Sequence, residues 1–248
     1  MTRLQRLVTL ALLGPVLSLV AHAADLESVI AKARRYVGAE RDLGAVRTLS
    51  YRGEIKIGGT DTAGSIEMLL AKPCSQLTVR VMGDRKETVG YDGDEGWVRL
   101  ESVTKPALSK IDIIPLKQLK LLRANVLENL AFYRGMEKQG VRIELRAETS
   151  FEGRAAVRVA FIHPGDIVFI RIFDQADGRL LLTEGPNGEV IREEGEVIVA
   201  GLRFPKRLVS SSKTPDGGTT SVTIDFTDIK VNEAFATELF AVPVPGSR

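Results

Sequence analysis

Few residues of this chain could carry out chemistry, and the densest group surrounds its only tryptophan. The stretch YDGDEGW, residues 91–97, places Asp92, Asp94 and Glu95 just before Trp97. A calcium-binding EF-hand loop alternates oxygen ligands with other residues and then requires a glycine. Here Gly96 stands where the third ligand belongs and Trp97 where the glycine belongs, so we expect no metal site. We interpret the stretch as a hairpin turn that places Trp97 on the inner face of a sheet.

Histidine and cysteine chemistry has little support in the sequence. The two histidines are His22, in an export signal described below, and His163, which precedes a Pro-Gly turn and is expected at the surface. The single cysteine, Cys74, has no histidine near it in the sequence to activate it as a nucleophile. Glu193 and Glu194 are adjacent in an expected strand and point to opposite faces, whereas a glycosidase needs two facing carboxylates. We therefore expect no catalytic residue and no cofactor.

The first 23 residues have the pattern of a secretory signal peptide. A basic start with Arg3 and Arg6 is followed by an apolar run over residues 7–20 and by Ala21-His22-Ala23. The run of about 14 residues is shorter than the roughly 20 that span a bilayer. We expect residues 1–23 to be cleaved and residues 24–248 to form a single periplasmic domain. The alternative is an uncleaved membrane anchor.

The charge balance argues against a nucleic-acid partner. The chain has 34 basic and 32 acidic side chains, and removal of Arg3 and Arg6 with the signal leaves 32 of each. A neutral mature chain lacks the basic excess that binds phosphate backbones. With one cysteine, no internal disulfide can form, which fits a mid-sized domain of a bacterial periplasm.

The elements that would position these residues are mostly strands. Apolar residues at helical spacing predict helices over residues 25–37 and within residues 113–135. Alternating apolar and polar residues elsewhere, with Asp-Gly and Asn-Gly turns, predict about ten strands joined antiparallel in one highly curved sheet. Residues 167–173 are apolar on both faces. Either helices cover one face of this strand, or an apolar ligand does.

The order of several short motifs resembles a known family. Lys72-Pro73 closes the second strand, and Asp92, Gly93 and Trp97 form a D-G-x-x-x-W hairpin. Further matches occur late in the chain, at Gly201, Pro205, Asn232, Phe240 and Pro243. This pattern is similar to the LolA-like periplasmic lipoprotein carriers and outer-membrane lipoprotein-sorting proteins, over essentially the whole mature chain.

The resemblance implies a fold and a ligand class. The fold would be mainly β with helices (α+β), a highly curved antiparallel sheet forming an incomplete barrel around a helical plug or lid. An apolar cavity between sheet and helices would hold lipoprotein acyl chains or lipid. The candidate wall residues are Met68, Leu70, Val79, Val81, Trp97, Leu119, Leu122, Phe161 and Phe226. Whether these residues line a cavity or form a solid core is open, because both give the same pattern.

The helix over residues 116–130 is the candidate lid, and Lys72 is the candidate lid latch. The family's lipoprotein carrier has an arginine at the position of Lys72, and lysine cannot form the same two-pronged fork of hydrogen bonds. Inner- and outer-membrane transport proteins are the implied partners of a monomeric carrier. The alternatives are an envelope sensor or protein-interaction module with the same fold and, third, an enzyme acting on envelope material.

Overall fold

The structure is a computed structural model that describes residues 25–60 and 62–243. The expected signal peptide therefore lies outside the described residues. The helices are α1 (Leu26–Val37), α2 (Glu40–Ala45) and α3 (Leu116–Leu130), with short 3-10 helices η1 (Met136–Gln139) and η2 (Thr237–Leu239). The strands are β1 (Thr48–Ile57), β2 (Ala63–Ala71), β3 (Ser75–Met82), β4 (Arg85–Tyr91), β5 (Gly96–Ser102), β6 (Ser109–Ile113), β7 (Arg142–Phe151), β8 (Arg154–His163), β9 (Ile167–Asp174), β10 (Leu180–Glu184), β11 (Val190–Glu194), β12 (Val197–Val199), β13 (Leu202–Phe204), β14 (Arg207–Lys213) and β15 (Thr219–Val231).

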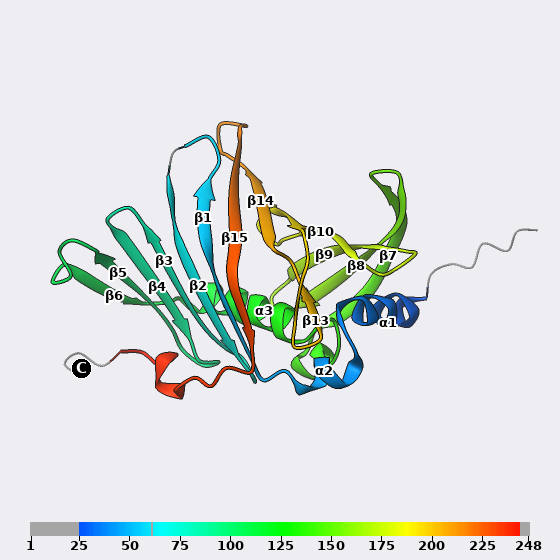
Figure 1. Cartoon of the computed structure of the whole chain (residues 1–248), viewed down its shortest axis with the longest axis horizontal. Helices are drawn as coiled ribbons and strands as arrows, with labels where there is room; N and C mark the ends of the chain where they lie inside the picture. Colours follow the sequence, from blue (N-terminus) through cyan, green and yellow to red (C-terminus); the bar gives the residue numbers. More distant parts are fainter. Residues whose placement is uncertain (1–24, 61, 244–248) are drawn as a thin grey trace, which may run out of the picture.

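Thirteen of these strands form one curved antiparallel sheet (Figure 1). Their order is β6-β5-β4-β3-β2-β1-β15-β14-β11-β10-β9-β8-β7, and β12 and β13 form a separate hairpin. The first and last strands along the chain, β1 and β15, pair with each other in the middle of the sheet. The edges are β6 and β7, which do not pair, so the sheet is an incomplete barrel.

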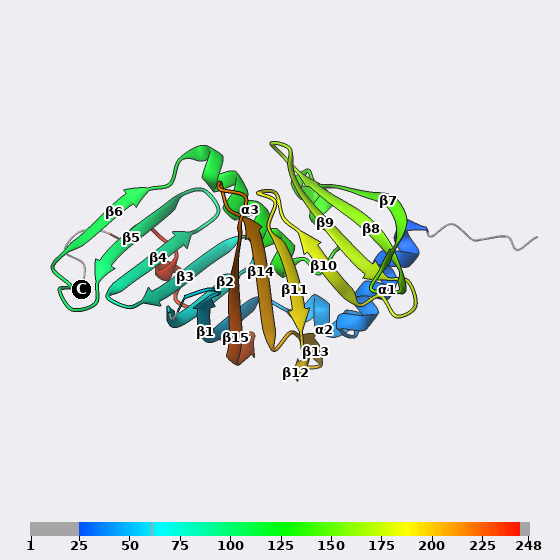
Figure 2. The same cartoon turned by 90° about the horizontal axis from the view of Figure 1, so that it is seen from above.

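The position of α3 follows from the topology. The chain leaves the sheet at one edge, β6, and re-enters it at the other, β7, and α3 lies on this connection. This link between the two edges crosses the concave side, where Figures 1 and 2 show α3. The predicted mainly β fold, with a curved antiparallel sheet around a helical plug, is confirmed.

Two apolar cores hold the helices against the sheet. One joins α1 and α3 to β8 and β9, with Phe161 and Phe173 fully buried. The other joins α2 and α3 to β1, β2 and the β12–β13 hairpin, with Leu49 and Val126 fully buried. Because each core contains residues of α3, this helix connects the two halves of the curved sheet.

The structure has more strands than the sequence predicted. Residues 189–199 alternate like one strand, but Gly195 adopts φ 64° and separates β11 from β12. Likewise, residues 203–212 divide around Pro205 into β13 and β14. In both places glycine and proline end a strand that the alternation of side chains alone would continue.

Trp97 lies on the opposite face of the sheet from the one expected. A Cβ at the preceding residue, Gly96, would come within 2.5 Å of Leu119 in α3, so that position faces the helix. Trp97 therefore faces away from α3, because successive strand residues point to opposite faces. Its cross-strand partner is Gly90, where a Cβ would come within 2.2 Å of the indole. The C-terminal segment, red in Figure 1, covers the ring, and Trp97 Nε1 donates to Phe240 O at 3.0 Å.

Candidate functional site

A cavity of about 220 Å³ lies between the concave face of the sheet and α3; we call it the interior cavity. Tyr51, Met68, Leu70 and Phe226 line it from β1, β2 and β15. These side chains share one face, because the strand registers pair Met68 with Tyr51 and Leu70 with Leu49. Residues of α3 and of β9 and β11 line the rest of the cavity. The interior is thus partly hollow.

The structure brings together only part of the predicted wall. Met68, Leu70 and Phe226 line the interior cavity, and Leu119 and Leu122 of α3 belong to the same apolar cluster. Phe161 is on the concave face of β8 but is fully buried in the core, with its ring centroid 6.1 Å from that of Tyr133.

Val79, Val81 and Trp97 do not face the interior cavity. The register of the β2–β3 hairpin pairs Met68 with Thr78 and Glu67 with Val79. Paired residues lie on the same face of a sheet, so Val79 and Val81 lie on the face away from α3. Each strand was read correctly as alternating, but its apolar face was assigned to the wrong side.

A buried charged cluster, formed by Glu128, His163 and Arg171, lies where α3 meets β8 and β9. Glu128 Oε1 is 2.7 Å from His163 Nε2, and Glu128 Oε2 accepts from Arg171 Nε at 2.9 Å. Only 5% of Glu128 and 3% of His163 are exposed. His163 was expected at the surface, and that expectation is wrong. Its strand ends in a surface turn, but its side chain points inward to the carboxylate of α3.

Two members of the charged cluster lie at the interior cavity. Glu128 and Arg171 line this cavity, and the guanidinium carbon of Arg171 lies 4.8 Å from the ring centroid of Tyr133. Burial opposes the positive charge of Arg171, but Glu128, Tyr133 and Glu193 together more than offset this, so the pKa of Arg171 is raised. The sequence held no local signal for the cluster, because its members come from three separate elements.

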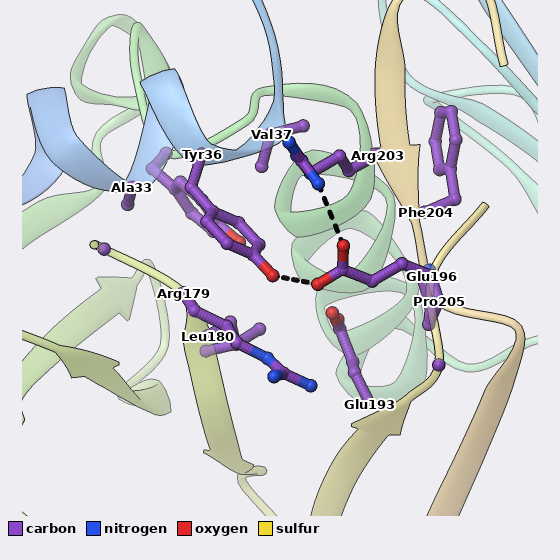
Figure 3. Close-up of a pocket in the computed structure, with 13 residues that line it drawn as sticks. Ala33, Tyr36, Val37, Arg179, Leu180, Glu193, Glu196, Arg203, Phe204 and Pro205 are labelled. Carbon is purple, nitrogen blue, oxygen red and sulfur yellow. Dashed lines mark hydrogen bonds and ion pairs between the residues drawn. The ribbon is translucent and has the colours of Figure 1, made fainter. Parts of the chain in front are cut away.

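A smaller side pocket of about 40 Å³ adjoins the interior cavity and shares Tyr133, Glu193 and Phe204 with it (Figure 3). Glu196 accepts hydrogen bonds there from Tyr36 and, at 2.9 Å, from Arg203. Partial burial and the Glu196 carboxylate raise the pKa of Tyr36 to about 12. The hydrogen bond from Tyr36 in turn lowers the pKa of Glu196.

Glu193 also points into this region, from the concave face of β11. Its side chain is exposed, although the protein around the carboxyl group partly desolvates it and raises its pKa. Arg171 and Arg179 act in the opposite direction. The interior cavity therefore has an apolar end near Met68 and a polar end near Glu193.

Arg34 of α1 connects this helix to α2 and to the segment that follows α3. Arg34 Nη1 donates to Phe132 O, just beyond the end of α3, at 2.5 Å. Its Nε and Nη2 donate to the two carboxylate oxygens of Glu40 at 2.7 and 2.6 Å. Lys72, the predicted latch, is exposed, and within the described residues its side chain has no hydrogen bond or ion pair.

Arg34→Lys is expected to lower the free energy of unfolding by about 1–3 kcal/mol. A lysine ammonium cannot hold both oxygens of Glu40 and the buried carbonyl of Phe132 at once. The measurement is urea unfolding followed by circular dichroism. Arg35→Lys is the control, because Arg35 is the exposed neighbour on α1. Equal stabilities of the two variants would contradict the role given to Arg34.

Metal and thiol chemistry find no support in the described part of the chain. Within residues 25–60 and 62–243, no three His, Cys, Asp or Glu side chains gather in a way that could hold a metal ion. Burial raises the pKa of the Cys74 thiol, which disfavours the reactive thiolate. Across these residues, no helix has the length and apolar character needed to span a membrane.

No protein-family model matches the sequence, and no curated protein matches it. Solved structures do match the fold. A LolA superfamily protein from Nitrosomonas europaea aligns with a TM-score of 0.59 and 13% identity, over 89% of this chain and 99% of that one. A DUF1329 family protein from Desulfovibrio piger gives 0.56 and 11%, over 87% and 96%. A domain assigned to outer membrane lipoprotein sorting from Vibrio parahaemolyticus gives 0.54 and 10%, over 85% and 94%. At these identities the likeness concerns the fold, which is LolA-like.

Proposed function

We propose that this protein is exported to the periplasm and binds the acyl chains of a lipid or lipoprotein in the interior cavity, as a carrier for outer-membrane sorting. The observation that carries the proposal is the hollow between α3 and the apolar side chains of Tyr51, Met68, Leu70 and Phe226. Burial of a methylene group contributes about 0.8 kcal/mol, so a short length of chain suffices for reversible binding. The LolA-like fold of the neighbouring structures supports this reading. We assign no catalytic role to the cavity.

Cargo entry would require α3 to move. The interior cavity has a volume of about 220 Å³, whereas sites for small organic ligands usually have about 300–1,000 Å³. Short segments outside the strands connect α3 to β6 at one edge of the sheet and to β7 at the other. Arg34 and the charged cluster hold the helix in place through hydrogen bonds. Outward movement of α3 would enlarge the cavity while the sheet keeps its hydrogen bonds.

The small volume is also the observation that favours an alternative function. An envelope sensor or protein-interaction module with the same fold would need no room for an acyl chain. Native mass spectrometry of protein purified from a periplasmic extract distinguishes the two. Co-purified lipid supports the carrier, whereas a stoichiometric protein partner without lipid supports the interaction module.

Met68→Trp is expected to weaken binding of a neutral fluorescent monoacylglycerol at least tenfold. The indole would occupy the apolar end of the interior cavity, where Met68 now leaves space. The control is Val79→Trp, which places the same ring on the other face of the sheet and should bind the probe as the wild type does. Affinities come from fluorescence titration, and thermal unfolding verifies that both variants fold. Equal loss in both variants, or in neither, would contradict binding in this cavity.

A further inference from the structure

A second hollow lies on the other side of α3; we call it the outer pocket. Its volume is about 410 Å³, within the usual range for ligand sites. Leu116, Lys120, Arg123 and Leu127 line it from α3 at intervals of three or four residues, with Leu119 beside them, and together they form one stripe of the helix. Asn125, Glu128 and Asn129 line the interior cavity from a different stripe. The two hollows share no lining residue, so they are separate sites.

The outer pocket carries positive charge that the protein leaves uncompensated. Arg123 Nη2 donates to a neutral partner, Gln139 Oε1, at 2.7 Å. Among the described residues, no hydrogen bond or ion pair engages the ammonium group of Lys120. Asp94 is the one acidic residue that lines the pocket, and the remaining ionisable groups are Tyr91 and His163. Two cations therefore face one carboxylate, which favours an anionic ligand.

His163, which lines this pocket, has one ring nitrogen without a hydrogen-bond partner among the described residues. Its Nε2 is engaged by Glu128, and its Nδ1 is buried without a partner. A buried polar atom that lacks a partner is uncommon in folded proteins.

The floor of the outer pocket is apolar, so a bare anion would fill only part of it. Leu116, at the edge of the outer pocket, is 69% exposed. A hydrocarbon chain bound in the pocket could cover this leucine. Leu119, Ala124 and Leu127 continue the apolar surface toward the interior of the protein. An amphiphile could place its chain along these residues and its charged group at Lys120 and Arg123.

We propose that the outer pocket binds an amphiphile with a single anionic head group, a carboxylate or a phosphate, at Lys120 and Arg123, with its hydrocarbon chain on Leu116 and Leu119. This site is distinct from the interior cavity, because the two hollows share no lining residue.

The test compares amphiphiles with the same chain and different head groups. Dodecanoate and dodecyl phosphate, below their critical micelle concentrations, are titrated calorimetrically into the mature chain beside dodecyltrimethylammonium, dodecyl maltoside and inorganic phosphate. We expect both anionic amphiphiles to bind at least tenfold more tightly than the cationic and neutral ones, and to bind more weakly as salt screens the charges. Equal affinity for all head groups would overturn the proposal. Inorganic phosphate binding as tightly as dodecyl phosphate would show a plain anion site and overturn the apolar part.

Variants then locate the binding. Lys120→Gln with Arg123→Gln should weaken both anionic amphiphiles at least tenfold. The control, Lys117→Gln with Lys138→Gln, removes the same charge from exposed residues that do not line the pocket. An equal loss of amphiphile binding in the control variant would show that only net charge matters, and it would overturn the proposed site. Leu116→Gln, an exposed position, should weaken dodecanoate severalfold and leave inorganic phosphate unchanged.

Met68→Trp separates this proposal from the proposed function. It should leave the anionic amphiphiles unaffected, because Met68 lines only the interior cavity of the two. Loss of monoacylglycerol binding in Met68→Trp, with dodecanoate binding intact, supports two sites. Dodecanoate binding that disappears with Met68→Trp would place the anionic amphiphile in the interior cavity and overturn the outer site.

Discussion

Replacing Glu128 by alanine is expected to lower the free energy of unfolding by about 3–5 kcal/mol. The carboxylate of Glu128 compensates the guanidinium of Arg171 at 2.7 Å, and the two side chains are 3% and 11% exposed. Removing one partner of a buried ion pair leaves the other charge buried without compensation, which costs more than the pair contributes. His163 Nε2 would lose its acceptor as well. Urea unfolding with linear extrapolation measures the change.

A double-mutant cycle distinguishes this cause from a simple loss of packing. Arg171→Leu removes the second charge, so the double variant Glu128→Ala with Arg171→Leu should be more stable than Glu128→Ala alone. Glu137→Ala, an exposed acidic position in η1, is the control and should change stability by less than about 0.5 kcal/mol. A double variant with additive losses would show that the two charges do not compensate each other.

Replacing Trp97 by alanine is expected to lower the free energy of unfolding by about 3–5 kcal/mol, as for other large buried aromatic residues. The indole is 3% exposed, covers Gly90 and donates to the carbonyl oxygen of Phe240. Its loss would leave a cavity between β4, β5 and the C-terminal segment. Trp97→Phe retains part of the ring but leaves the Phe240 carbonyl without its donor, so it should cost less, about 1–3 kcal/mol. Equal losses in the two variants would contradict this ranking.

Tryptophan fluorescence provides a second measurement at the same residue, because Trp97 is the only tryptophan in the chain. Deletion of residues 235–248 should expose the indole and shift its emission to longer wavelengths. A neutral lipid bound in the interior cavity should leave the emission nearly unchanged, since the sheet separates the ring from that cavity. A large change on lipid binding, with the C-terminal segment intact, would place the indole in the ligand site.

The outcome for Trp97 shows why its face could not be predicted. The turn at residues 91–97 was recognisable, and β4 and β5 do form a hairpin there. Alternation assigns Gly96 and Trp97 to opposite faces, but it does not say which face α3 covers. That depends on the final positions of a helix that begins 19 residues later and of a C-terminal segment that contacts the ring 143 residues away. The indole packs against the C-terminal segment, rather than against a lid helix or a lipid.

The wall of the interior cavity was partly predictable for the same reason. Met68 and Leu70 share a face, and so do Val79 and Val81, as alternation requires. The register of the β2–β3 hairpin then places these two pairs on opposite faces. A shift by one residue would have reversed the result, and nothing local to either strand determines it.

Residues close along the chain were enough to predict the local structure: the helices over Leu26–Val37 and Leu116–Leu130, the alternating strands, the turns and, through motif order, a LolA-like sheet. These features depend on neighbours within a few residues along the chain. Packing of distant elements sets the rest: which faces meet, the contacts of Glu128 with residues 35 and 43 positions away, and the hollows on both sides of α3. Buried charge pairs and cavities depend on the space left between packed elements, and that space is a property of the whole sheet and its helix.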